Sequence, residues 1–534
     1  MWSFPKKPVA VSEHIKLWLK LKGDFGRLNF SSIWQKLKSL PNSDMKILIL
    51  DSGGRGDALG WCFGQDPRVK DVFCLPGNAG MEKNGVVVRP EIRAPEEMAK
   101  FALEKKIDLA IGGAEGILSA GVVDVFGKYK IPIIGPKKEA TVLESSKGYT
   151  DLLCRELGVP VPEFEIFEDA QKAKAYINSL QYLPRTTDSL QTEDTKKQNQ
   201  KTVVRGSVVV KCDGLAEGKG AIVCENAKEA GEAVDRVFEM QRIGKWDGES
   251  VVIQKRIFGR ELSFFYITDG YTLIPLPVAQ DYKRAKDGDE GKNTGGMGSY
   301  SPHEWEGEKL TKIVTEKIAK PLIDGFREKR EILYQGFLYC GLIFEDGDIE
   351  KPILLEINVR LGDPEAEVIL PRLKTPLLDI CEAMIKNKLK DLQVEFDNDY
   401  FCDVVAASGE VKSTGKGKYP GYPGRYKIGF PVEGYFDPAP QKATGISLYR
   451  NVKKMPRNNN SDTTSVKLWC GARSLTFSAG IAKDPKKGYI TSGGRVLHVV
   501  GQGKTLEEAR KMAYEEIKRV SFEGMFYRKD IGFN

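Results

Sequence analysis

Short apolar runs alternate with glycine-containing loops and helix-like segments from Met45 onward, an order typical of a parallel α/β sheet. The expected strands are Lys46–Leu50, Val72–Leu75, Asp108–Ile111 and Pro132–Ile134. After the first strand, Asp51–Ala58 turns into a helix, and its glycines would let backbone amides approach an anion at the helix start. Their spacing is not the G-x-G-x-x-G that binds dinucleotides. An ordinary tight turn explains this loop equally well.

Polar and apolar residues also alternate after Leu354, which predicts a strand with two different faces. One face carries Glu356, Asn358 and Arg360, and the opposite face carries Leu355, Ile357 and Val359. Mg²⁺ takes oxygen ligands, usually one or two carboxylates together with substrate phosphates. The pattern therefore predicts a metal site at Glu356 and Asn358, with Arg360 placed to pair with a phosphate or carboxylate. A half-buried strand with solvated polar residues is the alternative.

Two strand-length apolar runs enclose a glycine loop between Val208 and Cys224. The loop has glycines at 214, 218 and 220 and carries Lys219, and Lys211 precedes it. Flexible backbone with two ammonium groups suits a triphosphate. No Ser or Thr follows Lys219 and the next run is strand-like, so we predict a hairpin flap rather than a P-loop. A structural hairpin with a solvated lysine is the alternative.

The segment Gln280–Pro302 is long, polar and dense in glycine. Such stretches between ordered elements are usually functional or disordered. The interleaved side chains Asp281, Arg284, Thr294 and Met297 argue against a simple linker.

Composition narrows the class of protein. A length of 534 residues predicts three or four domains, and no apolar stretch approaches the roughly 18 residues that span a membrane. Nine cysteines without a C-x-x-C pair indicate reduced, buried thiols in a cytoplasmic protein. The net charge of +7 is spread along the chain, which supports nucleic-acid binding only weakly and suits small anionic substrates equally well. The three histidines show no metal-like spacing, so we expect neither zinc nor histidine-based catalysis.

These segments together resemble the phosphoribosylamine-glycine ligase (glycinamide ribonucleotide synthetase) family of the ATP-grasp superfamily, from Met45 almost to Asn534. The pieces that carry the resemblance are Pro76–Gly80, Glu144–Lys147, Lys211–Gly220, Gln280–Pro302, Glu356–Glu365, Ser492–Leu497 and Arg528–Gly532. The resemblance implies a multidomain protein of α/β and α+β type.

The implied domains are an N-terminal parallel-sheet α/β domain at 45–146, a central ATP-grasp domain at 147–394 and a C-terminal β-rich domain at 395–534. Residues 1–44 are lysine-rich without a secretory cleavage site, and we interpret them as an N-terminal extension. Residues 184–202, 412–418 and 457–465 are polar, and we expect solvated loops there, the first being an insertion in the ATP-grasp domain. Thr505–Glu508 is a capping box that predicts a surface helix.

The resemblance implies that glycine is joined to 5-phosphoribosylamine through glycyl phosphate, with ATP cleaved to ADP and phosphate, in purine biosynthesis. It implies small-molecule substrates only, with no nucleic-acid or membrane partner, a monomer or weak oligomer, and a cytoplasmic location. An ATP-grasp ligase with a different amine substrate is the alternative.

The resemblance also assigns site residues. For ATP they are Lys147, Lys211, Asp213, Gly214, Gly218, Lys219, Gly220, Gln254, Lys255 and Glu261. For the other substrates they are Gly54, Arg55, Pro76, Gly77, Asn78, Asp281, Arg284, Thr294, Gly295, Gly296, Met297, Gly298, Arg360 and Asp363. The catalytic residues are Lys219, Asp281, Arg360 and Asp363, and the ligands of Mg²⁺ or Mn²⁺ are Glu356 and Asn358.

The chain departs from the family pattern at two places. The family's Gly-Gly-Arg-Glu-His-Ala is replaced after Gly53 by Gly54-Arg-Gly-Asp-Ala58, so the Glu and His are absent, and we expect Asp57 to place a negative charge near the sugar phosphate. The usual hinge Glu-Glu-Phe-Leu is replaced by Gln254-Lys-Arg-Ile257. The first departure concerns the amine substrate and the second concerns adenine.

Overall fold

The computed structural model describes residues 44–183, 203–205, 207–214, 220–242, 248, 250–412, 419–435 and 474–533. Several predictions lie outside these residues: the extension up to residue 43, the insertion 184–202, most of the loop 412–418, the loop 457–465, and the site residues Gly218 and Lys219.

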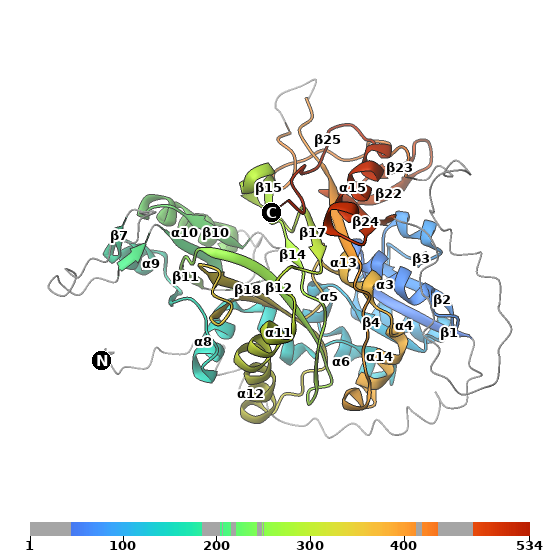
Figure 1. Cartoon of the computed structure of the whole chain (residues 1–534), viewed down its shortest axis with the longest axis horizontal. Coiled ribbons are helices and arrows are strands. Elements are labelled where there is room, and N and C mark those ends of the chain that lie inside the picture. Colours follow the sequence, from blue (N-terminus) through green and yellow to red (C-terminus); the bar gives the residue numbers. More distant parts are fainter. Residues whose placement is uncertain are drawn as a thin grey trace. The chain divides into compact units, whose positions relative to one another are not determined.

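Parallel strands form the N-terminal sheet in the order β3-β2-β1-β4-β5 (Figure 1). They are β1 (Met45–Asp51), β2 (Val69–Pro76), β3 (Val87–Val88), β4 (Leu109–Gly112) and β5 (Ile133–Ile134). The helices of this part are α3 (Gly54–Gly64), α4 (Pro95–Lys105), α5 (Glu115–Ser119) and α6 (Val122–Lys128). Ile47 to Leu50 are fully buried because helices cover both faces of such a sheet. The predicted parallel α/β arrangement is confirmed.

A second sheet has the order β10-β9-β11-β6 and follows two short helices, α7 (Val142–Ser145) and α8 (Lys147–Leu157). Its strands are β6 (Phe164–Phe167), β9 (Val208–Cys212), β10 (Ala221–Cys224) and β11 (Val251–Lys255), and it packs against α9 (Ala170–Ser179) and α10 (Ala227–Arg242). Two further short strands, β7 (Gln181–Leu183) and β8 (Val203–Arg205), pair with each other and do not belong to this sheet. Strands β9 and β10 pair antiparallel, so the predicted hairpin is confirmed.

A third sheet, in the order β13-β12-β18-β19, carries the polar strand. Its strands are β12 (Gly259–Thr268), β13 (Leu273–Pro275), β18 (Gly336–Glu345) and β19 (Pro352–Asn358). Helices α11 (Glu308–Val314), α12 (Lys320–Arg330), α13 (Ala366–Ile369) and α14 (Leu377–Ile385) flank it in sequence.

Strand β19 contains a bulge that corrects one prediction. Leu354 lies opposite Leu342 and Glu356 opposite Gly341, so Leu355 is an extra residue without a partner. The bulge shifts the alternation: Leu354 and Ile357 are buried in the core, whereas Leu355 is only partly buried. The prediction that Leu355 shares a face with Ile357 was wrong.

The C-terminal sheet has the order β14-β17-β20-β24-β21, with β25 paired to β20. Its strands are β14 (Gln280–Asp281), β17 (Gly298–Ser301), β20 (Tyr400–Ser408), β21 (Ser474–Ser478), β24 (Arg495–Gly503) and β25 (Met525–Phe526). Two hairpins, β15–β16 (Arg284–Lys286 with Glu290–Asn293) and β22–β23 (Ile481–Asp484 with Gly488–Thr491), complete the strands. Because β14 and β17 belong to this sheet, the glycine-dense segment between them is fixed beside the C-terminal residues.

Helix α15 (Leu506–Glu516) packs on β24 and β20. The Thr505 side chain accepts a hydrogen bond from the backbone N–H of Glu508, as the capping box predicts. The eight cysteines among the described residues are all buried thiols, as expected. In the part of the chain that the structure describes, no helix is long and apolar enough to cross a membrane.

Candidate functional site

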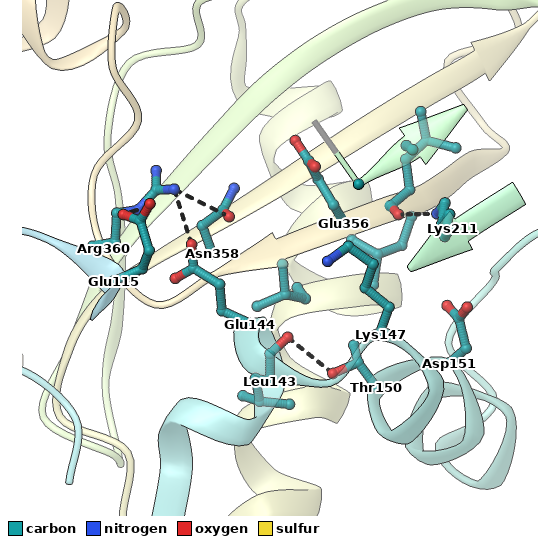
Figure 2. Close-up of a pocket in the computed structure, with 15 residues that line it drawn as sticks. Glu115, Leu143, Glu144, Lys147, Thr150, Asp151, Lys211, Glu356, Asn358 and Arg360 are labelled. Carbon is teal, nitrogen blue, oxygen red and sulfur yellow. Dashed lines mark hydrogen bonds and ion pairs between the residues drawn. The ribbon is translucent and has the colours of Figure 1, made fainter. Parts of the chain in front are cut away.

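A cavity of about 100 Å³ lies where β19, α8 and the β9–β10 hairpin meet (Figure 2). Its polar lining residues are Glu115, Glu144, Lys147, Thr150, Asp151, Lys211, Glu356, Asn358 and Arg360. In Figure 2, the group around Arg360 lies on one side, Lys147, Lys211 and Asp151 lie on the other, and Glu356 stands between them. The fold therefore brings acidic and basic side chains from four separate segments together around one cavity.

Glu356 and Asn358 both line this cavity from β19, as the alternation predicts. Burial alone would raise the pKa of Glu356, but Lys283, Lys211 and Lys147 lower it to about 2, so the carboxylate is ionised at neutral pH. An ionised carboxylate beside an amide oxygen is a donor set that fits Mg²⁺ or Mn²⁺. The residues present thus fit the divalent cation that the resemblance implies.

Arg360 is held by two carboxylates. Its Nε donates to Glu115 Oε2 at 3.1 Å, and its Nη2 lies 2.9 Å from Glu144 Oε1 and donates to Asn358 Oδ1 at 3.5 Å. Arg360 lowers the pKa of Glu115 to about 2. The guanidinium therefore points along the cavity wall next to Asn358, in a fixed orientation.

The two lysines on the other side of the cavity donate to backbone carbonyl groups rather than to carboxylates. Lys147 Nζ donates to Gly214 O at 2.9 Å, and Lys211 Nζ donates to the bulged Leu355 O at 2.8 Å. Burial lowers the pKa of Lys211. Both ammonium groups keep further donors for a polyanion.

Asp213 lies beside the start of α8. It accepts hydrogen bonds from Gly148 N at 3.1 Å, Ser250 Oγ at 2.9 Å and Ser146 Oγ at 3.3 Å. It thus caps the start of α8 and is not among the residues that line the cavity. Gly220 lines the cavity from the end of the hairpin loop.

The replaced hinge begins at a buried side chain. Gln254 is 1% exposed, and its Nε2 donates to Asp151 Oδ2 at 3.0 Å. Burial raises the pKa of Asp151 to about 6. Lys255 lies 3.9 Å from Glu163 and is partly exposed. The Gln254 side chain is therefore occupied within the protein, and the backbone of its strand, β11, pairs with β6 on one side and β9 on the other.

A second, smaller cavity lies next to Glu356 and is lined by Glu261, Ser263, Asp281, Lys283 and Tyr339. Lys283 Nζ donates to Glu356 Oε1 at 3.0 Å and lies 3.6 Å from Glu261 Oε2. Burial and Glu365 raise the pKa of Asp281. Sequence reasoning selected Asp281 and missed Lys283, although the two are two residues apart and share one face of an extended segment.

The substrate-side residues of the N-terminal sheet gather at its carboxyl edge. Gly54 and Arg55 follow β1, while Pro76 ends β2 and Gly77 and Asn78 follow it. Arg55 is 5% exposed, and its Nε donates to Asp51 Oδ2 at 2.7 Å. Asn78 Nδ2 donates to the carbonyls of Ser52 and Ser478, each at 3.0 Å. Both side chains therefore brace the loops, and the carboxyl edge of a parallel sheet is where ligands bind in such folds.

Asp57 does not face this edge. It is fully buried and accepts hydrogen bonds from Ser478 N at 2.7 Å, Ser478 Oγ at 2.9 Å and Asn84 Nδ2 at 2.7 Å. Burial raises its pKa. The expectation that Asp57 places a charge near a sugar phosphate was wrong, because the turn of α3 directs it to strand β21.

Asp363 lies at a junction of three separate segments. Its Oδ2 accepts from Arg55 N at 3.4 Å, and its Oδ1 lies 3.0 Å from Arg495 Nη1 and 3.5 Å from His498 Nε2. Burial would raise the pKa of Asp363, but Arg495, His498 and Arg55 lower it. The carboxylate therefore ties the β1–α3 loop to strand β24.

His498 also corrects a prediction. Ligand-type atoms of Asp363, Glu367 and His498 lie within 4.8 Å of one another, whereas we expected no histidine in such a cluster. His498 Nδ1 lies 2.7 Å from Asp403 Oδ2. Sequence spacing could not reveal the cluster because its members come from distant segments.

The remaining predicted residues build the loop between β14 and β17. Arg284 Nη1 donates to Gly291 O at 2.8 Å across the β15–β16 hairpin. Thr294 Oγ1 donates to Lys283 O at 2.9 Å and accepts from Gly296 N. Arg495 Nη1 donates to the carbonyl of Gly295 at 2.8 Å, Met297 is fully buried, and Gly298 pairs in β17. These residues support the second cavity and do not line either cavity.

Three family models match the chain. They are the phosphoribosylglycinamide synthetase N domain at residues 45–144, its ATP-grasp (A) domain at 145–366 and its C domain at 419–534.

Several curated relatives match nearly the whole chain. A phosphoribosylamine--glycine ligase of Archaeoglobus fulgidus is 35% identical over 92% of this chain and 99% of its own length. One of Caldanaerobacter subterraneus subsp. tengcongensis is 34% identical over 91% and 99%. The trifunctional purine biosynthetic protein adenosine-3 of Gallus gallus is 35% identical over 91% of this chain and 42% of its own length.

Solved structures agree. The crystal structure of phosphoribosylamine--glycine ligase from Thermotoga maritima is 29% identical, has a TM-score of 0.66, and covers 91% of this chain and 100% of its own. The biotin carboxylase domain of Hydrogenobacter thermophilus 2-oxoglutarate carboxylase, solved with MgADP, is 14% identical at a TM-score of 0.60 and shares the fold alone.

Proposed function

The chain belongs to the phosphoribosylglycinamide synthetase family, and from this premise we propose that it ligates glycine to 5-phosphoribosylamine with cleavage of ATP. The products are glycinamide ribonucleotide, ADP and phosphate, in purine biosynthesis. The observation that carries the proposal is the joining of Glu356 and Asn358 with Lys147 and Lys211 in one cavity. Such a set binds a nucleoside triphosphate together with a divalent cation.

The reaction has two steps. A carboxylate oxygen of glycine attacks the γ-phosphorus of ATP, the bond to the β-phosphate oxygen breaks, and ADP leaves with that electron pair. The amine of phosphoribosylamine then attacks the acyl carbon of glycyl phosphate, loses a proton, and expels inorganic phosphate. Neither step needs a covalent bond to the protein, so catalysis rests on positioning and charge neutralisation.

The lysines and the arginine of the first cavity supply that neutralisation. Lys147 and Lys211 hold the phosphates, and Arg360 is positioned by its two carboxylates to meet charge that develops at the transferred phosphoryl group. Gly214, Gly218 and Gly220 would let the backbone of this segment approach the phosphates closely, and Lys219 would add its ammonium group to the phosphate contacts. A covered site would also keep water from glycyl phosphate.

Glu356 and Asn358 would hold Mg²⁺ or Mn²⁺ with their side-chain oxygens. When bound, the cation withdraws charge from the phosphate oxygens. The backbone around Gln254 and Lys255 would contact adenine, and Glu261 would contact the ribose. The adenine contact is what the family resemblance implies, whereas Glu261 lines the second cavity.

The second cavity would receive glycine, with Asp281 and Lys283 as the groups for its amine and carboxylate. The loops at Gly54 and Gly77 would hold the sugar phosphate through backbone amides at the sheet edge. Arg55, Asn78 and Asp363 would set the shape of these loops, because their side chains are already hydrogen bonded within the protein. Thr294 to Gly298 and Arg284 would support the glycine side.

We further propose a cytoplasmic enzyme that acts on small molecules as a monomer or weak oligomer. The alternative amine substrate is tested together with the proposed one. Purified protein is supplied with ATP, Mg²⁺ and glycine, and ADP release is followed with freshly generated phosphoribosylamine or with other primary amines.

We expect ADP release that requires both glycine and phosphoribosylamine, and formation of glycinamide ribonucleotide by mass spectrometry. Glu356→Ala should lower turnover by at least about 100-fold while the protein stays folded, since the residue lies at a cavity wall. A matched control is Glu350→Ala, which removes an exposed glutamate outside both cavities. Release of ADP with another amine but never with phosphoribosylamine would overturn the substrate assignment.

A further inference from the structure

Lys283 places an ammonium group against the carboxylate that the proposed function assigns to the metal. Its Nζ is 3.0 Å from Glu356 Oε1, the position of a counter-ion. The backbone of Lys283 is fixed, because its carbonyl accepts from Thr294 N at 2.8 Å and from Thr294 Oγ1 at 2.9 Å. The ammonium therefore reaches Glu356 from a rigid base and can change position only through side-chain rotation.

The pair is not needed to neutralise a fully buried charge. The Glu356 side chain is 39% exposed and the Lys283 side chain is 32% exposed, and both line cavities. An ion pair with this much exposure adds little stability. A purely structural role is therefore a weak explanation for its place in the cavity wall.

Lys283 has a second set of acidic partners within reach. Glu261 Oε2 lies 3.6 Å from its Nζ, and Asp281 lines the same small cavity. If Lys283 leaves Glu356, its charge still meets a carboxylate. The Lys283 ammonium group can therefore move into the second cavity when another cation binds Glu356.

The charges around Glu356 disfavour a bare divalent cation. Three ammonium groups, those of Lys147, Lys211 and Lys283, act on this carboxylate. A bare cation must displace one of them and is repelled by the other two. The phosphates of a nucleotide would reverse this balance, because they bring several negative charges to the same lysines.

We propose that Lys283 occupies the cation's place at Glu356 in the free enzyme, so that the divalent metal binds only together with the nucleotide, when Lys283 turns toward Glu261 and Asp281. The proposal rests on the metal site of the proposed function, but it does not depend on which amine is the substrate.

The test measures metal binding directly. Mn²⁺ is titrated into the full-length protein, without nucleotide and with the non-hydrolysable ATP analogue adenylyl imidodiphosphate. Free Mn²⁺ is read by electron paramagnetic resonance, and the Mn²⁺ bound by the analogue alone, measured without protein, is subtracted. In the wild type we expect binding at least about tenfold tighter with the analogue. Lys283→Met removes the competing charge and should tighten Mn²⁺ binding without nucleotide by about tenfold or more.

Two further variants test whether the tighter Mn²⁺ binding of Lys283→Met occurs at Glu356. Lys283→Met combined with Glu356→Gln should lose the gain, because the carboxylate is the shared partner. Lys309→Met removes a lysine from an exposed pair with Glu350, 2.6 Å apart, and should leave Mn²⁺ binding unchanged.

The outcomes separate this proposal from the proposed function. Equal Mn²⁺ affinity of the wild type with and without the analogue would overturn the proposal, and this measurement does not depend on the folding of any variant. A folded Lys283→Met protein that binds Mn²⁺ no better than the wild type would also overturn it. Absence of Mn²⁺ binding in both states would overturn the metal site as well. Ligase activity is not read, so failure of the amine substrate assignment leaves the result unaffected.

Discussion

Asp151 is a buried carboxyl group at the edge of the nucleotide cavity, and it makes the stability of the protein depend on pH. Burial raises its pKa from 3.8 to about 6, against the opposing charge of Lys211. A carboxyl whose pKa is raised on folding contributes stability below its unfolded pKa and loses it as the pH rises through the folded value. The interval from 3.8 to about 6 corresponds to at most about 3 kcal/mol.

We therefore predict that Asp151→Asn becomes more stable relative to the wild type as the pH rises from 4 to 7. The amide keeps an oxygen that can accept from Gln254 but cannot ionise. The measurement is urea unfolding of both proteins at several pH values. A stability difference that does not change with pH would contradict the prediction.

Asp57 is the second residue whose burial has a measurable effect. Its carboxylate accepts three hydrogen bonds, two from Ser478 and one from Asn84. Ser478→Ala removes one of them and leaves the backbone bond, so we expect a loss of about 1–2 kcal/mol in the free energy of unfolding. The Michaelis constants for ATP and phosphoribosylamine should stay within about twofold, because Asp57 does not face the sheet edge. Ser179→Ala, at an exposed helix end, is the control.

For single residues, alternation along a strand was enough to predict that Glu356 and Asn358 share one face, because a strand presents every second residue to the same side. It failed for Leu355 because a bulge depends on the partner strand, which the local pattern does not contain. Arg495 could not be linked to Asp363, 132 residues away, without the fold. Local periodicity thus predicted ligands on one strand and missed contacts between segments.

The start of helix α3 is held at its glycines by close packing. A Cβ at Gly54 would lie 2.5 Å from Glu367 Oε1 and from His498 Cδ2, both of which are buried. We predict that Gly54→Ala displaces the β1–α3 loop, destabilises the protein by about 1–3 kcal/mol and raises the Michaelis constant for phosphoribosylamine more than that for ATP. Thermal unfolding and steady-state kinetics measure both effects.

The control for this prediction is Gly116→Ala in α5, where a Cβ would meet nothing within 4 Å. There the alanine favours the helix, and we expect unchanged or slightly increased stability, by about 0.5–1 kcal/mol. If the two substitutions behave alike, the packing argument for Gly54 fails.

The sequence predicted which segments form helices or strands more reliably than it predicted which strands pair with each other. The apolar runs of the N-terminal sheet and the β9–β10 hairpin were predicted because period and turn residues are local features. Strands β14 and β17 were not assigned to the C-terminal sheet, because each is short and because the pairing of β14 with β17 and of β17 with β20 is decided by tertiary contacts. The loop that carries Lys283 is therefore positioned by a sheet that its own sequence does not indicate.

At the scale of the whole molecule, residues near the C-terminus fasten the β15–β16 hairpin. Arg528 is 1% exposed in its side chain, and its Nη1 donates to Arg284 O at 3.0 Å and to Asp289 Oδ1 at 2.8 Å. Asp530 Oδ2 accepts from Gly288 N at 2.8 Å. This hairpin directly follows Lys283, so the contacts hold the segment beside the second cavity.

Lys286 and Lys292 are exposed on the hairpin. We predict that Arg528→Ala loosens the hairpin and speeds trypsin cleavage after these two lysines, because about 2–3 kcal/mol of charged hydrogen bonds are lost. Mass spectrometry of timed digests measures cleavage after these lysines. Arg519→Ala removes an exposed arginine paired with Glu516 and serves as the control. Equal cleavage rates in the two variants would contradict the prediction.

The bond between Asp57 and Ser478 has a consequence for synthesis of the chain, because 421 residues separate its two ends. A ribosome that adds 5–20 residues per second needs roughly 20–80 seconds to cover that distance. During this interval two side chains of the nascent α3 are exposed to solvent. The carboxylate of Asp57 lacks the hydrogen-bond donors of Ser478, and the ring of Trp61 lacks Phe477, on which it packs in the complete protein. We expect molecular chaperones to bind this exposed face of α3 first. Once β21 has been synthesised and packs there, it should block that binding.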